Sequence, residues 1–396
     1  MQAFLDGLIG SGTSTLHREL VYLLGMVAFG SVVVFGFILP VAGITSWVER
    51  RVWARMQSRI GPNRVGPGGF LQWLADGLKN LLKEDVIPAA ADPVLFRLAP
   101  YVVVTGFVAA FVAIPFAGAL IISDLNIGIL YITAVTSLVV VGILMAGWSS
   151  NNRWSMLGGI RSATQIVSYE IPAGLSIFPV VLLSGSLSMQ KIIESQGWLP
   201  WTWHMFHSPF TLASFLLFFI GALAEGNRTP FDLPEAESEL VAGFVTEYSG
   251  MRFLLFFLAE WGNLYLIGAI VTTLYLGGWQ VPHFTSNTVI LTAAQFGTFF
   301  LKAYFFVFVA MWIRATLPRV RVDQLTSLCW KYMVPIALGC VLGTAALMVF
   351  VPQGGIAETL LRFGTFGLVL LVIVQFARRV RYHLQRARGL QPGLAT

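Results

Sequence analysis

Nine long apolar runs divide this chain of 396 residues, and they limit what it can fold into. A helix needs about 20 mostly apolar residues to cross the hydrocarbon core of a bilayer. Charged residues make up only 11 % of the chain, whereas soluble domains contain about 25 %. We therefore predict an all-α polytopic membrane protein, one integral membrane domain over residues 1–396, with about nine transmembrane helices. The runs cover approximately residues 20–48, 95–118, 129–148, 161–184, 208–225, 251–277, 288–313, 330–351 and 357–377.

Lysine and arginine are distributed unevenly between the connections that join these runs. Positively charged residues are enriched in cytoplasmic connections of membrane proteins. If the N-terminus lies outside, the inner connections hold twenty-one Lys and Arg, and the outer ones hold only Arg18, Lys191 and Arg362. This predicts an outer N-terminus and an inner C-terminus. The C-terminal segment 352–396 is then an additional span followed by an Arg-rich tail, which we expect to anchor that span rather than to bind nucleic acid.

The predicted inner connection over residues 49–94 is long and contains an unusual turn segment. Its middle, "GPNRVGPGG", is rich in turn-forming residues and cannot be a regular helix. Leucines at 71, 74, 78 and 81 follow at helical spacing, with polar residues on the other faces. This pattern predicts an amphipathic helix at about 70–85 that lies in the membrane interface.

Several classes of chemistry are disfavoured by the residues that the chain contains. Cys329 and Cys340 are the only cysteines, so no set of four thiolates is present to hold an iron–sulfur cluster. His204 and His207 could share a helix face, but their Trp-rich surroundings favour a membrane-interface belt over a metal site. Nucleotide-binding fingerprints do not occur. We expect no redox centre, metal or nucleotide site in this chain.

A second predicted inner connection, over residues 225–250, is rich in acidic residues. Asp232 and Glu235 have the spacing of a capping box, and Glu237 and Glu239 follow where the helix dipole favours negative charge. A capped interfacial helix would explain Asp232 and Glu235 without any function.

Other carboxylates lie within or beside the apolar runs, where an isolated ionised carboxylate costs roughly 2.5–3.5 kcal/mol on insertion. For any single residue, a structural hydrogen bond or ion pair explains its presence nearly as well as a function. Taken together with the acidic connection, the group favours a proton relay. For Lys302, which lies deep in an apolar run, we expect a partner in the protein interior. The carboxylates of this group are Glu170, Glu225, Glu247 and Glu260.

Long ordered motifs of this chain resemble the H-type membrane subunit of respiratory complex I, the proton-pumping NADH:quinone oxidoreductase of bacteria. The mitochondrial counterpart of that family is subunit 1, and the resemblance extends over about residues 20–351. It implies a location in the bacterial cytoplasmic (inner) membrane. The motifs are "ERRVWARMQSRIGPNRVGPGGFLQWLADGLKNLLKED", "RSATQIVSYE", "AEGNRTPFDLPEAESELVAGFVTEYSG", "AEWGNLYL", "WIRATLPRVRVDQL" and "CWKYMVP".

The resemblance implies a role at the junction of the two arms of the complex. The subunit would form much of the tunnel by which quinone, the substrate, reaches a peripheral arm that carries flavin and iron–sulfur clusters. Its partners would be the peripheral-arm quinone-site subunits, the antiporter-like membrane subunits and the lipid bilayer. The implied quinone-binding residues are Glu49, Arg50, Gln57, Arg59, Asp76, Arg228 and Phe231. The implied proton-relay residues are Glu170, Glu225, Glu235, Glu237, Glu247 and Glu260.

Two other interpretations remain open at this point. The same type of subunit serves membrane-bound hydrogenases and ferredoxin-linked complexes, some of which do not use quinone. A free-standing secondary transporter could use Glu170 and Glu260 for ion coupling, but the large inner connections and the missing internal repeat disfavour it.

Overall fold

The structure is a computed structural model that describes residues 30–234, 237–282, 287–351 and 355–389, together with residues 20, 24–25 and 27–28. Side chains of residues 237–238 and 384–389 are not described. Every regular element in this part of the chain is a helix. The predicted all-α class is therefore confirmed.

Eight helices in the described residues are long and apolar enough to cross a membrane. The helix α9 (Pro209–Glu225) is also apolar but has 17 residues, which is near the lower limit of about 17 for a span. All nine predicted runs thus form helices, and the chain is a multi-pass membrane protein. The eight long spans are Gly30–Met56, which includes η1 (Val34–Ile38) and α3 (Leu39–Met56), α5 and η3 (Pro93–Ala113), α6 (Gly128–Ser149), α7 (Arg153–Ser184), α11 (Gly250–Tyr275), α12 (Thr288–Thr316), α13, η7 and α14 (Val322–Phe350), and α15 (Ile356–Gly389).

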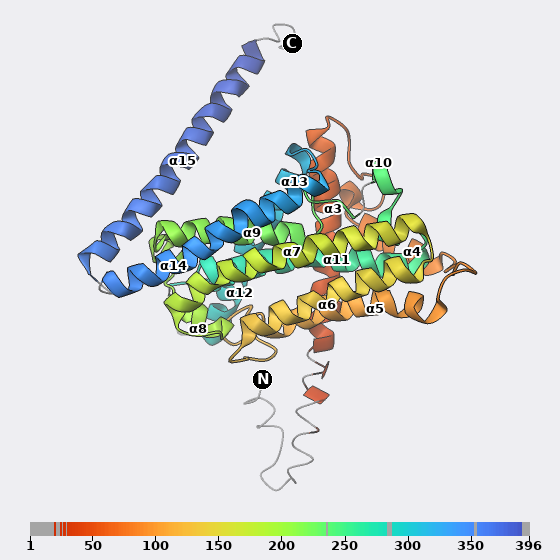
Figure 1. Cartoon of the computed structure of the whole chain (residues 1–396), viewed down its shortest axis with the longest axis horizontal. Helices are drawn as coiled ribbons and strands as arrows, with labels where there is room; N and C mark the ends of the chain where they lie inside the picture. The colour runs from red at the N-terminus through yellow and green to blue at the C-terminus, as the bar shows by residue number, and fades with distance from the viewer. Residues whose placement is uncertain are drawn as a thin grey trace.

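The spans pack into a bundle from which one helix departs. Figure 1 shows α5, α6, α7, α11 and α14 running roughly alongside one another, while α3 crosses them steeply and α15 diverges from the body. Small residues allow some of these close approaches. A Cβ atom built on Gly268 of α11 would lie 2.5 Å from the carbonyl oxygen of Ala303 in α12. Only glycine fits at that crossing.

Short polar residues fix where several helices begin. The Asp92 carboxylate accepts hydrogen bonds from the backbone N–H groups of Val94 and Leu95 at the start of α5. Asn152 caps α7 in the same way, and Ser208 forms a reciprocal capping box with Thr211 at the start of α9. These caps satisfy N–H groups that have no partner within the helix.

The first span extends further than its apolar run. The helix α3 (Leu39–Met56) continues through Glu49 and Arg50, whereas the run was expected to end near residue 48. The connection therefore starts at Gln57. Charge does not end the helix here because Glu49 is buried against cationic partners described below.

The turn segment and the amphipathic helix both lie in the connection that follows. "GPNRVGPGG" contains only the short η2 (Pro67–Gly69), and a Cβ on Gly69 would lie 2.2 Å from the Pro62 carbonyl oxygen. The helix α4 (Gln72–Leu82) falls within residues 70–85, for which an amphipathic helix was predicted, and it leaves Leu74, Leu78 and Leu81 exposed. Exposed leucines on one helix face suit an interface with lipid.

The remaining elements are short and lie in the connections. The acidic connection contains the short helix α10, which is described from Glu237. The capping box predicted from Asp232 and Glu235 stays a prediction, because Glu235 lies outside the described residues. These elements are α8 (Met189–Glu194), η4 (Pro200–Thr202), η5 (His204–Phe206), α10 (Glu237–Leu240) and η6 (Gly243–Val245).

Candidate functional site

A cluster of four charged side chains lies buried where α3, α11 and α12 meet the connection after α9. Arg228 Nη1 lies 3.0 Å from Glu49 Oε1, and Arg228 Nη2 lies 3.2 Å from Glu260 Oε1. Arg314 Nη1 donates to Glu49 Oε1 at 2.5 Å, and Trp261 Nε1 donates to Glu49 Oε2 at 2.8 Å. Two carboxylates and two guanidinium groups therefore balance one another at a depth where an unpaired charge would be costly.

The connection that holds Arg228 is fixed by main-chain contacts. Gln165 of α7 donates to the carbonyl oxygens of Ala224 at 2.8 Å and Phe231 at 2.7 Å. Asn227 takes the left-handed backbone conformation (φ 50°), which asparagine adopts more readily than most residues. Arg228 is only 2 % exposed, so its guanidinium is held between Glu49 and Glu260.

Asp232 forms a second ion pair at the edge of this connection. Its Oδ2 atom lies 3.1 Å from Arg319 Nη2. Burial raises the pKa of Asp232 above its ordinary value, and the nearby Arg319 opposes this effect only in part. The carboxyl is thus one that a change in local charge could protonate.

The implied quinone-binding residues occupy four separate places. Glu49 and Arg228 belong to the buried cluster. Arg50 pairs with Asp76 of α4 at 2.5 Å, which ties α4 to α3. Beyond the end of α3, Arg59 donates to Gln57 at 2.7 Å in an exposed position, and Phe231 lies buried against Tyr169, with ring centroids 5.4 Å apart.

Three of the implied relay residues line two small neighbouring cavities. One cavity, of about 50 Å³, is lined by Glu260 and Glu225, and the other, of about 30 Å³, by Glu225 and Glu170. Thr136 and Asn263 line both. A water molecule needs roughly 10–15 Å³ of such space and several polar partners. The arrangement can therefore accommodate water between Glu260, Glu225 and Glu170.

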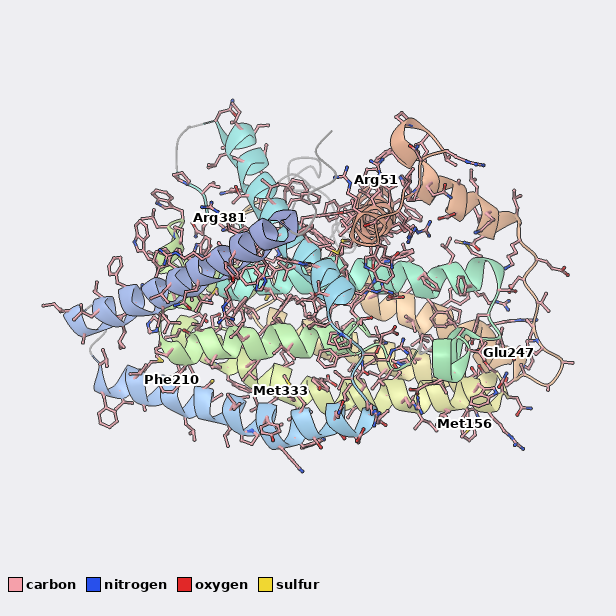
Figure 2. The ribbon with its side chains drawn as sticks, turned by 90° about the horizontal axis from the view of Figure 1, so that it is seen from above. Arg51, Met156, Phe210, Glu247, Met333 and Arg381 are labelled. Atoms are coloured by element: carbon pink, nitrogen blue, oxygen red, sulfur yellow. The ribbon has the colours of Figure 1, made fainter. Side chains whose placement is uncertain are left out.

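Glu247, another implied relay residue, is not among the residues that line these cavities. Glu247 accepts a hydrogen bond from Asn152 at 2.6 Å near the start of α7. Figure 2 shows it near Met156, at the opposite end of the bundle from Phe210. Glu235 and the side chain of Glu237 lie outside the described residues. Glu239, also in the acidic connection, pairs with Arg161 at 2.7 Å.

Most of the chain matches a known protein family. The family described as NADH dehydrogenase matches residues 29–345. The chain belongs to the NADH dehydrogenase family. Similar proteins include the H subunit of the NADH-quinone oxidoreductase of Anaeromyxobacter dehalogenans, which is 54 % identical over 87 % of this chain and 86 % of that protein.

Two further relatives support the same family. The H subunit of the NADH-quinone oxidoreductase of Chlorobium luteolum is 47 % identical over 77 % of this chain and 84 % of that protein. The corresponding H subunit of Dehalococcoides mccartyi is 47 % identical over 86 % of this chain and 92 % of that protein. The resemblance to the H-type membrane subunit of complex I is therefore confirmed.

In this member of the NADH dehydrogenase family, the sequence did not predict that Arg314 and Trp261 contact Glu49 in the buried charge cluster. An arginine at the inner end of a span has the same appearance as a membrane anchor. Lys302 does have interior partners, but they are the carbonyl oxygens of Leu276 and Gly278, at 2.8 and 3.1 Å, rather than an acid. Among the residues that the structure describes, no three His, Cys, Asp or Glu side chains gather into a metal-binding group.

Proposed function

We propose that this chain is the quinone-tunnel and coupling subunit of a proton-translocating NADH:quinone oxidoreductase. It lies in the bacterial cytoplasmic membrane with its N-terminus outside and its C-terminus inside. The observation that supports this most directly is the contact of Arg228 with both Glu49 and Glu260. One guanidinium thus joins a residue of the quinone-binding set to a residue of the relay set.

The chemistry of quinone reduction explains why this junction matters. Each quinone takes up two electrons and two protons to become a quinol, and NADH supplies the electrons through flavin and iron–sulfur clusters in partner subunits. Electrons that arrive before protons leave negative charge on the quinone oxygens. Arginines beside the path, such as Arg50 and Arg59, are donors suited to these oxygens. The tunnel needs apolar walls and few polar groups.

The buried cluster provides a physical route for coupling. Negative charge near Glu49 draws Arg228 and Arg314 toward it and weakens their hold on Glu260. Glu260 then favours its protonated form, because a buried carboxylate without a cation is costly. A proton taken up at Glu260 can pass through water in the two cavities to Glu225 and Glu170. Glu235, Glu237 and Glu247 would serve the inner entrance of this path.

The proposed partners follow from the exposed parts of the chain. Arg59 and its neighbours in the connection after α3 are exposed at the predicted inner side and suit a contact with the peripheral arm. The proton relay would continue along the membrane into the antiporter-like subunits. Because the flavin and iron–sulfur clusters belong to other subunits, we expect no activity from the isolated chain.

Glu260→Gln and Glu225→Gln test the proposal in inside-out vesicles that contain the assembled complex. Both substitutions keep the size of the side chain, but glutamine cannot take up and release a proton as a carboxyl group does. We expect proton pumping to fall by about tenfold or more, while NADH oxidation by ferricyanide persists. Lumen acidification and NADH–quinone activity are the measurements.

Glu239→Gln is the matched control, since Glu239 is exposed and lies away from the cavities. Normal coupled turnover in both relay variants would remove Glu260 and Glu225 from the path. If deletion of the chain leaves NADH–quinone activity untouched but abolishes hydrogen- or ferredoxin-linked activity, the quinone-enzyme proposal is wrong.

A further inference from the structure

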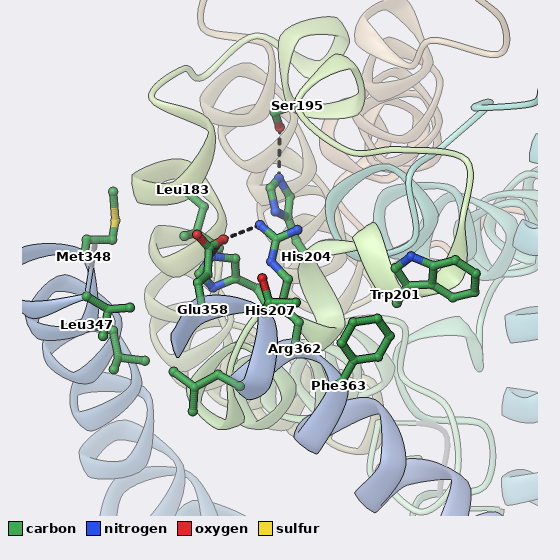
Figure 3. Close-up of a pocket in the computed structure, with 13 residues that line it drawn as sticks. Leu183, Ser195, Trp201, His204, His207, Leu347, Met348, Glu358, Arg362 and Phe363 are labelled. Atoms are coloured by element: carbon green, nitrogen blue, oxygen red, sulfur yellow. Dashed lines mark hydrogen bonds and ion pairs between the residues drawn. The ribbon is translucent and has the colours of Figure 1, made fainter. Parts of the chain in front are cut away.

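A large pocket, separate from the buried charge cluster, lies where α7 and α14 end and α15 begins. Its volume is about 490 Å³, within the range of roughly 300–1,000 Å³ that is usual for small-molecule sites. Figure 3 shows Glu358 and Arg362 of α15 clustered with His207 at its wall. The buried charge cluster contributes no residue to its lining.

The polar side of the pocket contains one anion and one cation. Glu358 Oε1 lies 2.5 Å from Arg362 Nη2 and 3.2 Å from His207 Nε2. Burial and the nearby Arg362 lower the pKa of His207, with Glu358 opposing. Burial also lowers the pKa of His204 to about 3. Both imidazoles are therefore neutral near pH 7, and the charges are those of Glu358 and Arg362.

Two buried polar atoms at the wall have unused hydrogen-bonding capacity. Arg362 Nε and His207 Nδ1 have no hydrogen-bond partner among the described residues. A neutral His207 that donates Nε2–H to Glu358 keeps Nδ1 as an acceptor. The pocket wall thus offers one free donor, on the arginine, and one free acceptor, on the histidine.

Much of the remaining lining is apolar, and it includes residues from the adjacent ends of α14 and α15. Leu347 and Met348 of α14 and Phe363 of α15 form part of its wall. From this point α14 and α15 diverge (Figure 1), and Phe350 and Leu360 are 83 % and 67 % exposed. In a bilayer, acyl chains are the material available to cover such surfaces.

We propose that this pocket binds the headgroup of phosphatidylethanolamine, with the acyl chains lying between α14 and α15. The lipid phosphate accepts hydrogen bonds from the Arg362 guanidinium, and the ammonium donates to Glu358 and His207 Nδ1. A zwitterion matches a site that has one charge of each sign, whereas an anionic headgroup would bring its extra negative charge close to Glu358. The site lies on the additional C-terminal span and does not depend on the proposed quinone chemistry.

The test compares lipid retention in the purified assembled complex after detergent washing and reconstitution with defined lipids. Native mass spectrometry counts the lipids bound when phosphatidylethanolamine or phosphatidylglycerol with the same acyl chains is added. We expect the wild type to retain one more phosphatidylethanolamine than Arg362→Gln or Glu358→Gln. Retention in these variants should weaken about tenfold, as expected for loss of a charge-assisted hydrogen bond.

Two more variants separate binding from misfolding. Met348→Trp fills the pocket but leaves the Glu358–Arg362 ion pair intact, and it should lose the same lipid. Arg378→Gln changes an exposed arginine of α15 far from the pocket and should retain it. Equal phosphatidylethanolamine retention in all variants would overturn the proposal, as would equal retention of phosphatidylglycerol. Competition by free phosphoethanolamine at the same concentration as the lipid would identify a soluble ligand instead.

Discussion

The helices α11 and α15 are both apolar enough to span a membrane, yet they have opposite surroundings. In the most apolar window of α11, 61 % of the residues are buried inside the protein, against 6 % in α15. The difference lies in their polar residues. Glu260, Trp261 and Asn263 interrupt α11 near its middle, whereas the charges of α15 gather near its ends. Polar residues within an apolar run mark the helix that faces protein rather than lipid.

The same contrast applies to the ion clusters at these helices. At Glu260, the central Arg228 and Glu49 side chains are 2 % and 6 % exposed, and those of Glu260 and Arg314 are 15 % and 21 % exposed. At Glu358, the side chain is 12 % exposed and that of its partner Arg362 is 33 % exposed. A buried ion pair stabilises little by itself, but removing one partner leaves a costly charge. The two clusters should therefore respond very differently to substitution.

Arg228→Met should have the largest effect on stability. It leaves Glu49 with Arg314 alone and Glu260 without its close cation, so we expect a destabilisation of about 3–5 kcal/mol. The measurement is the amount of assembled complex and its thermal inactivation temperature. The double variant Arg228→Met with Glu260→Gln should recover part of the loss, because it removes the unpaired carboxylate. No recovery would mean that Arg228 acts mainly through main-chain packing.

Gly268→Leu tests whether α11 is packed more tightly against its neighbours than α15. Gly268 lies on α11, where even a Cβ would approach the Ala303 carbonyl oxygen to 2.5 Å. We expect a loss of about 3 kcal/mol, since backbone cannot move aside as a side chain can. Gly367→Leu on α15 is the control, because no atom lies within 4 Å of a Cβ at that position. Equal thermal stability of the two variants would contradict the assignment of α11 to the interior and α15 to the lipid.

The sequence was sufficient to predict the helices but not all of their ends. Each of the nine apolar runs became a helix because length and apolarity determine whether a segment can span a bilayer. The end of α3 was missed by several residues, since Glu49, Arg50 and Arg51 look like the start of a polar connection. Glu49 stays within the helix because Arg228, Arg314 and Trp261 contact it. These partners come from distant parts of the chain, and only the tertiary structure brings them together.

The candidate site could be predicted in parts rather than as one assembly. The acids of the apolar runs stand out because charge is rare there, and this signal identifies Glu170, Glu225 and Glu260. It does not reveal that Glu225 lies between the other two, which depends on how α7, α9 and α11 pack. Arg314 gave no comparable signal. Its role follows from the crossing of α12 and α3, where its guanidinium also lies 4.6 Å from the centroid of a Trp53 ring.

The stability of the region around His204, beside the start of α15, should depend on pH. His204 is buried and hydrogen-bonds Ser195 at 2.9 Å, and its pKa is lowered to about 3, against about 6.5 in an unfolded chain. Between these two values the unfolded chain binds more protons than the folded one. Stability is therefore lost as the pH falls below about 6.5. The pKa of the neighbouring His207 is also lowered, so His207 contributes in the same direction. Glu358 opposes this lowering of the His207 pKa.

Hydrogen exchange of residues 200–207 at pH 7 and pH 5 measures this dependence in the assembled complex. We expect local protection to fall by at most about 2 kcal/mol between the two values, and His204→Gln should reduce the fall because glutamine does not titrate. The exchange of α11 serves as an internal reference, since it contains no histidine. An identical fall in the wild type and in His204→Gln would mean that a group other than His204 controls the opening of this end of the bundle. A fall shared by α11 would mean that the whole bundle opens rather than the α15 junction alone.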